Sequence, residues 1–276
     1  MHPALTFSQH SLSDFQDCPR RFYLRYVAQQ AWPAPDETSG GLGQDELDYL
    51  RQGRTLHRWI ERHWLNISPS NAQWERAPST LRQWWERFRQ TSFDHLPPIR
   101  QPEVELVADL GGYRLYARFD LLAYDEALES VVIVDWKTMG FPQPPSYDFW
   151  CKRMQTRVYL YVLVTAGAAL FAGRAPAPER CSIWYWLANH PEAPWVRVPY
   201  TQAAYELDRR QLGELVAEIA RRKDEQDFEQ TLDQRQCARC VYRLLCQRTS
   251  SSTTDWLLDD DLPLPDDIAS VQELEY

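Results

Sequence analysis

The stretch that decides the fold is VVIVDWK, residues 131–137, in which four apolar residues lead into an acid, a tryptophan and a lysine. An unbroken apolar run of this length is typical of a strand buried on both faces. Because side chains alternate along a strand, we expect Asp135 and Lys137 on the same face. A second strand-like run, Tyr113 to Phe119, ends at Asp120, 15 positions before Asp135. We expect the two strands to be neighbours and to bring both carboxylates together.

These side chains are suited to hydrolysis of a phosphodiester. Two hard oxygen ligands with open coordination positions suit Mg²⁺ or Mn²⁺. A lysine beside such an ion can orient or deprotonate a water, and the ion can offset charge on a phosphate oxygen. Asp-x-Lys also arises by chance on exposed strands. The interpretation therefore depends on the apolar run, on Asp120 and on the motifs below.

The composition is that of a globular protein, with 276 residues, 44% hydrophobic and 25% charged. The first ten residues lack the apolar stretch of a secretory signal. The longest nearly apolar segment, residues 158–173, is shorter than the roughly 20 residues that a membrane span needs. We therefore expect a cytoplasmic protein that does not contact a membrane.

Charge is distributed unevenly along the chain. The formal net charge is −9, yet residues 255–276 hold eight acids and no Lys or Arg. Global charge affects association and solubility and does not exclude a local basic groove for nucleic acid. We expect the acidic tail either to be solvated or to compete with DNA for such a groove.

The order of predicted elements indicates a mixed α/β core with helical flanks. Gly111-Gly112 is a two-residue turn signal between two strands of a meander. Strands are expected at 103–110, 113–122, 130–137, 181–187 and 195–199, helices at 11–27, 45–66, 79–93, 149–171 and 201–222, and a loop at 28–44. We expect one domain over residues 1–254, with a helical insertion around 45–95, followed by the acidic tail at 255–276.

Cys237-x2-Cys240-x5-Cys246 has the spacing of a soft metal site near the end of the chain. In a reducing compartment six cysteines are better explained by metal binding than by disulfides. Three thiolates leave one position open, for which Cys18, Cys151 and Cys181 are candidates. Zinc and an iron–sulfur cluster both suit four thiolates.

Together these residues resemble the PD-(D/E)XK nuclease superfamily. More narrowly, they resemble its RecB-like, iron–sulfur members, which are the AddB helicase-nuclease subunit and the CRISPR-adaptation exonucleases. The resemblance runs from Ser11 to about Cys246. Its motifs, in order, are Ser11-Leu12-Ser13 through Cys18-Pro19-Arg20-Arg21-Phe22-Tyr23, Gly53-Arg54-Thr55-Leu56-His57, Arg118-Phe119-Asp120, Asp135-Trp136-Lys137, Gln155-Thr156-Arg157-Val158-Tyr159, and the cysteines at 237, 240 and 246.

The resemblance implies a restriction-endonuclease-like core, with a central mixed β-sheet flanked by helices. It implies a divalent metal held by His57, Asp120, Asp135 and the backbone carbonyl of Trp136, with Lys137 as the catalytic lysine. One departure is Ala117, which stands where the family usually has glycine.

Further roles follow from the same resemblance. Gln155 would orient the catalytic lysine or a phosphate, and Tyr159, on the same helix face, would pack against or hydrogen-bond the DNA backbone. The acid that the family has upstream of its first aspartate corresponds to Glu103 or Glu105. Cys18 would be the fourth cluster ligand, so that a [4Fe-4S] cluster, or alternatively Zn²⁺, joins the N- and C-terminal segments.

The function implied is that of a metal-dependent deoxyribonuclease, most simply an exonuclease on single-stranded or end-bearing DNA. Its setting would be repair, recombination or CRISPR adaptation, with a helicase or a CRISPR-adaptation protein as partner. No Walker-type phosphate loop occurs, so the chain is not itself a helicase. The alternatives are a non-catalytic nucleic-acid-binding or assembly subunit with a structural iron–sulfur or zinc site, and a zinc-stabilised interaction module.

Overall fold

The computed structural model describes residues 6–30, 44–138, 140, 143–237 and 240–248. The strands are β1 (Thr6–Phe7), β2 (Ile99–Leu110), β3 (Tyr113–Tyr124), β4 (Val131–Lys137), β5 (Cys181–Leu187) and β6 (Trp195–Pro199). The α-helices are α1 (Gln9–Asp17), α2 (Pro19–Phe22), α3 (Gln44–Trp64), α4 (Asn71–Arg76), α5 (Ser79–Gln90), α6 (Tyr147–Lys152), α7 (Met154–Ala166) and α8 (Gln202–Glu225). A π-helical turn (Tyr23–Val27) and short 3₁₀ turns (Gly167–Ala169, Pro178–Arg180, Gln234–Cys237) complete the described elements.

The strands form one mixed sheet in the order β1-β3-β4-β5-β6, and β2 pairs with the other edge of β3. The pairs β2–β3, β3–β4 and β5–β6 are antiparallel, whereas β1–β3 and β4–β5 are parallel. The parallel β4–β5 pair needs a crossover connection, which α6 and α7 supply. The β2–β3 turn is at Gly111 and Gly112, both with positive φ, as the sequence predicted.

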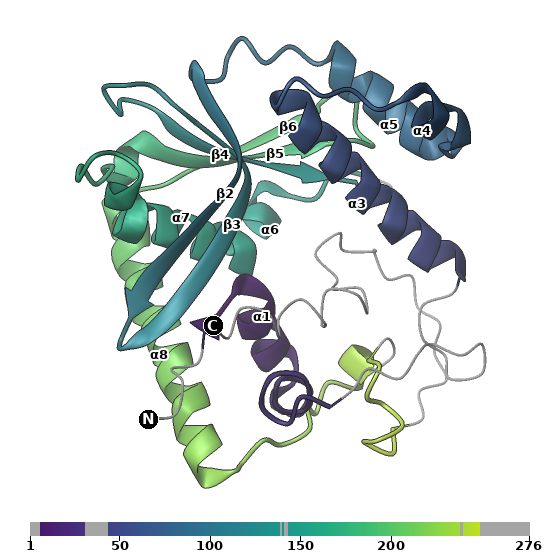
Figure 1. Cartoon of the computed structure of the whole chain (residues 1–276). Coiled ribbons are helices and arrows are strands. Elements are labelled where there is room, and N and C mark those ends of the chain that lie inside the picture. Colours follow the sequence, from purple (N-terminus) through teal and green to yellow (C-terminus); the bar gives the residue numbers. More distant parts are fainter. Residues whose placement is uncertain (1–5, 31–43, 139, 141–142, 238–239, 249–276) are drawn as a thin grey trace.

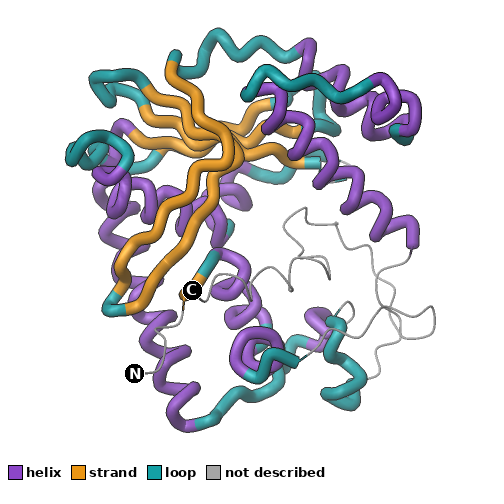
Figure 2. Tube along the Cα trace, viewed as in Figure 1, coloured by secondary structure: helices purple, strands orange, loops and turns teal. Residues whose placement is uncertain are grey.

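Helices cover both faces of this sheet (Figures 1 and 2). One core lies between the sheet and α1, α7 and α8, and the other lies between the sheet and α3 and α5. In β4, Val131 and Ile133 face the first core, whereas Val132, Val134 and Trp136 face the second. Every residue of β4 is buried for this reason, which explains its unbroken apolar run. The mixed α/β prediction is therefore confirmed.

One predicted helix is wrong. The stretch 149–171 is not continuous, because the backbone of Arg153 is not helical (φ −58°, ψ 138°) and separates α6 from α7. The hydroxyl of Thr156 donates to the Trp150 carbonyl at 2.6 Å, so that a side chain satisfies an acceptor in the last turn of α6. An apolar stretch does not reveal this break, since both pieces bury apolar side chains.

Other boundaries also differ from expectation. The predicted helix 11–27 breaks at Cys18, whose backbone is extended (φ −162°, ψ 106°), before Pro19 opens α2. Strand β2 begins four residues before the predicted 103, and β1 and α4 were not predicted. Most of the predicted loop 28–44 and the whole acidic tail 255–276 lie outside the described residues. No helix in the described ranges combines the length and apolar character of a membrane span.

Candidate active site

The two predicted carboxylates lie where the pairing between β3 and β4 stops. The antiparallel ladder runs up to Leu121 opposite Val134, so Asp120 and Asp135 are the next residues on their strands. The Asp120 Oδ2 accepts a hydrogen bond from the backbone N–H of Trp136 at 3.0 Å. The side chain of Asp120 is therefore bound directly to the segment that carries Asp135 and Lys137.

Asp135 and Lys137 lie on one face of β4 and form a buried ion pair. Lys137 Nζ is 2.9 Å from Asp135 Oδ2, and the side chains are 1% and 3% exposed respectively. The other oxygen of Asp135 accepts a hydrogen bond from Gln155 Nε2 of α7 at 2.7 Å. Removing two charges from water costs more than their attraction returns unless the surroundings are well matched. A contribution to stability therefore does not explain why this ion pair is buried.

His57 reaches the same place from the opposite face of the sheet. It lies on α3, and its Nδ1 is 3.3 Å from Asp120 Oδ2. Burial by itself would raise the pKa of Asp120, but His57, the Trp136 amide and Lys137 outweigh burial and hold that pKa below its usual value. Asp120 is therefore the anionic partner of a histidine contributed by a helix more than 60 residues earlier in the chain.

Of the two upstream acids, Glu103 lies at this site and Glu105 does not. Pro102 pairs with Leu121 and Val104 with Phe119, so Glu103 lies opposite Asp120. Burial, and then the Asp120 charge, raise the pKa of Glu103 to about 7.

The backbone at Glu103 is unusual, and its carboxylate pairs with Arg118. The residue has a φ of +52°, a conformation that costs energy for a residue other than glycine. Arg118 Nε is 3.2 Å from its carboxylate. The exposed Glu105 instead accepts from the Tyr116 hydroxyl at 2.9 Å.

Tyr159 is one helical turn beyond Gln155 on α7, as the spacing predicted. Its ring packs edge-on against Phe119 at 5.3 Å between centroids, and the side chain is buried. The Arg118 charge is close enough to interact with its hydroxyl electrostatically. In this structure Tyr159 supports the β3 residues beside Asp120.

One residue at the site was not predicted. Tyr185 of β5 pairs in register with Asp135, and its ring centroid lies 5.9 Å from Lys137 Nζ. The Trp150 ring packs on the Tyr185 ring at 4.4 Å, and the Tyr185 hydroxyl hydrogen-bonds Thr156 Oγ1 at 2.7 Å. Lys137 therefore lies between a carboxylate and an aromatic ring. No local pattern could have found Tyr185, because only the pairing of β5 with β4 brings it here.

The donors are of the kind that a divalent cation takes, namely carboxylates and an imidazole. As they stand, however, no three His, Cys, Asp or Glu side chains in the described ranges are arranged so that they could hold a metal. The Asp120 and Asp135 carboxylates are instead paired with His57 and Lys137. The predicted ligands fit a metal by chemistry, and the side chains must move from these ion pairs to bind one.

The comparison with known families decides the classification. A family model described as the PD-(D/E)XK nuclease superfamily matches residues 6–247, which is most of the chain. The chain belongs to the PD-(D/E)XK nuclease superfamily. This match covers the site residues described above and confirms the broader part of the resemblance.

A solved structure agrees with this membership at the level of the fold. A protein from Eubacterium rectale, provisionally named an exonuclease, is 14% identical with a TM-score of 0.50, and the match covers 90% of each chain. A protein named SSO0001 is 14% identical with a TM-score of 0.42, over 87% of this chain and 85% of the other. No curated protein matches the sequence. The superfamily model does not separate the iron–sulfur branch, which remains a prediction.

The four cysteines predicted as cluster ligands all line one small cavity. They are Cys18, Cys237, Cys240 and Cys246. All are free thiols, and burial raises the pKa of the last three. Cys151 and Cys181 are not part of this lining; they lie in α6 and β5. The fold thus brings the four thiols together, although in the part of the chain that the structure describes no three of them are placed so that they could hold a metal ion.

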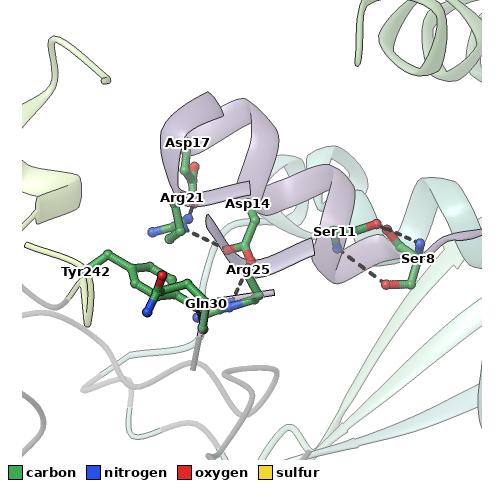
Figure 3. Close-up of polar contacts among 8 residues, drawn as sticks. All are labelled: Ser8, Ser11, Asp14, Asp17, Arg21, Arg25, Gln30 and Tyr242. Atoms are coloured by element: carbon green, nitrogen blue, oxygen red, sulfur yellow. Dashed lines mark hydrogen bonds and ion pairs between the residues drawn. The ribbon is translucent and has the colours of Figure 1, made fainter. Parts of the chain in front are cut away.

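A polar network attaches this cysteine segment to the N-terminal helices (Figure 3). Asp14 accepts from Arg25 at 2.5 Å and pairs with Arg21 at 2.8 Å, and all three side chains are at most 15% exposed. The hydroxyl of the buried Tyr242, between Cys240 and Cys246, donates to the Gln30 carbonyl at 3.3 Å. The N-terminal segment and the cysteine segment therefore meet through direct protein contacts.

Proposed function

We propose that this chain is a metal-dependent deoxyribonuclease that hydrolyses phosphodiester bonds. The observation that carries the proposal is the buried Asp135–Lys137 pair beside the Asp120–His57 pair, in a chain of the PD-(D/E)XK superfamily. A buried lysine held between a carboxylate and an aromatic ring is expensive for stability and useful for hydrolysis.

The proposed ligands of Mg²⁺ or Mn²⁺ are His57, Asp120, Asp135 and the Trp136 carbonyl. When bound, the ion lowers the pKa of a water and offsets charge on the scissile phosphate. Lys137 donates hydrogen bonds to the attacking water and to the oxygen on which charge develops. Gln155 holds the Asp135 carboxylate at 2.7 Å and so keeps Lys137 in place. Glu103, opposite Asp120, is the candidate acid for an outer-sphere water.

The substrate and the pathway are finer parts of the same proposal. The chain acts as an exonuclease on single-stranded or end-bearing DNA, in repair, recombination or CRISPR adaptation, beside a helicase or a CRISPR-adaptation protein. Support comes from the resemblance of the motifs and from the structural neighbour named as an exonuclease.

The decisive experiment is Lys137→Ala with labelled DNA and Mg²⁺ or Mn²⁺. We expect cleavage to fall at least 100-fold, because an electrostatic donor to the developing charge contributes about 10²–10³ to the rate. Circular dichroism checks that the variant is folded. Lys223→Ala on α8, which removes a lysine from another face, is the matched control and should cleave like the original protein. Equal cleavage by the Lys137 and Lys223 variants rejects the proposed site.

We further propose that Cys18, Cys237, Cys240 and Cys246 hold a [4Fe-4S] cluster, with Zn²⁺ as the alternative. The support is that all four thiols line one cavity. Cys240→Ser should remove visible absorbance and lower the melting temperature, whereas Cys151→Ser in α6 should do neither. A colourless original protein that contains zinc would decide for Zn²⁺.

A further inference from the structure

The short helix α6 is packed against the floor of the candidate active site. Its Trp150 is fully buried, and the ring stacks on Tyr185 at 4.4 Å between centroids. Tyr185 in turn lies 5.9 Å from Lys137 Nζ and pairs with Asp135 across the strands. One layer of aromatic side chains therefore separates α6 from the catalytic lysine, and Figure 1 shows α6 beside α7 on that side of the sheet.

The outer side of α6 exposes aromatic rings, which is unusual in this protein. Tyr147 is 55% exposed and Phe149 is 36% exposed, whereas Trp150 in the same helix is buried. Elsewhere in the described ranges, the exposed large apolar side chains are all aliphatic. Aromatic side chains bury much area when packed, so two partly exposed rings on one short helix form a surface that a ligand can cover.

Positively charged side chains lie next to these rings. The Arg153 guanidinium lies 5.4 Å from the Phe149 ring centroid and 5.7 Å from that of Trp150. Lys152 is 75% exposed, and its ion pair with Asp148 at 2.7 Å is equally open to solvent. An exposed pair of this kind contributes little, so a phosphate can compete for the lysine. The helix thus presents rings and positive charge together.

Rings with adjacent cations are the surface that unpaired nucleobases and their phosphates fit. In a duplex the faces of the bases are already stacked on each other, so these rings cannot reach them. We propose that Tyr147 and Phe149 stack on unpaired bases of a DNA strand entering the site, with Lys152 and Arg153 beside its phosphates. This inference rests on the proposed nuclease function and assigns the single-stranded end as the form of DNA that is engaged.

The test is binding of a fluorescent single-stranded oligonucleotide, measured by anisotropy in the Lys137→Ala protein so that the strand stays intact. Tyr147→Ala with Phe149→Ala should weaken binding by at least fivefold and up to about a hundredfold, the range for losing base–aromatic stacking. Replacing both residues by Trp should retain binding. Leu207→Ala, which trims an exposed apolar side chain of α8 (41% exposed), is the matched control and should change nothing.

An abasic strand separates stacking from charge. The parent protein should bind an oligonucleotide with abasic sites more weakly than the normal strand, whereas the double alanine variant should bind both alike. The proposal is overturned if the parent and the double alanine variant favour the normal strand over the abasic strand to the same degree. It is also overturned if the double alanine variant loses as much affinity for blunt duplex as for the single strand. Unchanged DNA binding with an altered sedimentation mass would assign the patch to a second copy of the chain and also overturn it.

A parallel cleavage assay keeps the two proposals apart. If the unmodified protein cleaves the same strand, and binding of the strand does not depend on Tyr147 and Phe149, only the role of α6 is rejected. Ring-dependent binding without any metal-dependent cleavage rejects the nuclease function and leaves α6 as a binding surface.

Discussion

At the scale of single residues, the site is a set of charges held where charge is expensive. Lys137 and Asp135 are almost entirely buried, and Asp120 is kept anionic by His57 and a backbone amide. Glu103 is the exception, because burial and the neighbouring Asp120 raise its pKa to about 7. Its ionised form is therefore disfavoured in the folded protein, and this has a measurable consequence for stability.

The direction in which stability changes with pH follows from the pKa of Glu103, which is about 7 in the folded protein against a reference value of 4.5. The ionisation penalty is nearly absent below pH 4.5, grows as the pH rises to 7, and is full above it. In metal-free buffer, Glu103→Gln should raise the unfolding free energy by about 1–3 kcal/mol at pH 8, and by less than half as much at pH 5.5. Denaturant titrations at both pH values measure this.

Glu105→Gln is the control for this pH dependence, because Glu105 lies on the same strand, is exposed and bonds to Tyr116. Because this side chain is exposed, its substitution should change the unfolding free energy little. An identical gain for Glu103→Gln at pH 5.5 and pH 8 would contradict the raised pKa.

At the scale of elements, the break between α6 and α7 does two things for the site. It turns α6 so that Trp150 packs on Tyr185, and it starts α7 at Met154, so that Gln155 in its first turn reaches Asp135. Thr156 holds the break, since its hydroxyl donates to the Trp150 carbonyl and also bonds the Tyr185 hydroxyl. The three groups are buried, so they depend on one another for hydrogen bonds.

Thr156→Val keeps the shape of the side chain and removes the hydroxyl. We expect a loss of about 1–3 kcal/mol in unfolding free energy, because a buried carbonyl and a buried phenol lose their partner. Urea denaturation measures it. Thr165→Val, further along α7, is the control, since its hydroxyl lies 3.4 Å from the Tyr205 hydroxyl at a partly exposed position. If both variants lose the same stability, the α6–α7 joint does not depend on Thr156.

At the scale of the whole molecule, the N-terminal segment contacts the segments that follow α8 (Figures 1 and 3). The Arg20 amide donates to the Glu229 carbonyl at 3.0 Å, and Tyr242 bonds to Gln30. Asp14 pairs with Arg21 and Arg25 on the N-terminal side of this joint, and Arg25 in turn interacts with Tyr242. Closing a loop of more than 200 residues costs chain entropy, which these contacts offset.

Asp14→Ala should lower the unfolding free energy by about 3–5 kcal/mol, because it leaves two buried guanidinium groups without their shared carboxylate. Thermal and denaturant unfolding measure the loss. The control is Asp48→Ala, which breaks an exposed pair with Arg51 and should change stability by less than about 1 kcal/mol. Similar small effects of the two substitutions would show that the network does not hold the ends together.

The periodicity of short segments determined much of the local structure and the placement of neighbouring side chains. The alternation of β4 placed Asp135 beside Lys137, the helical spacing of α7 placed Tyr159 one turn beyond Gln155, and Gly111-Gly112 turned β2 into β3. These features follow from rules that act over a few residues, so they can be inferred without the fold.

Contacts between distant segments were decided only by the tertiary structure. Glu103 rather than Glu105 faces Asp120 because of strand register, and Tyr185 reaches Lys137 because β5 lies beside β4. At the break beside Arg153, the Trp150 carbonyl accepts from the Thr156 hydroxyl, which also bonds the Tyr185 hydroxyl of the distant strand β5. Such contacts depend on how helices and strands pack across the sheet, and packing is a property of the whole chain.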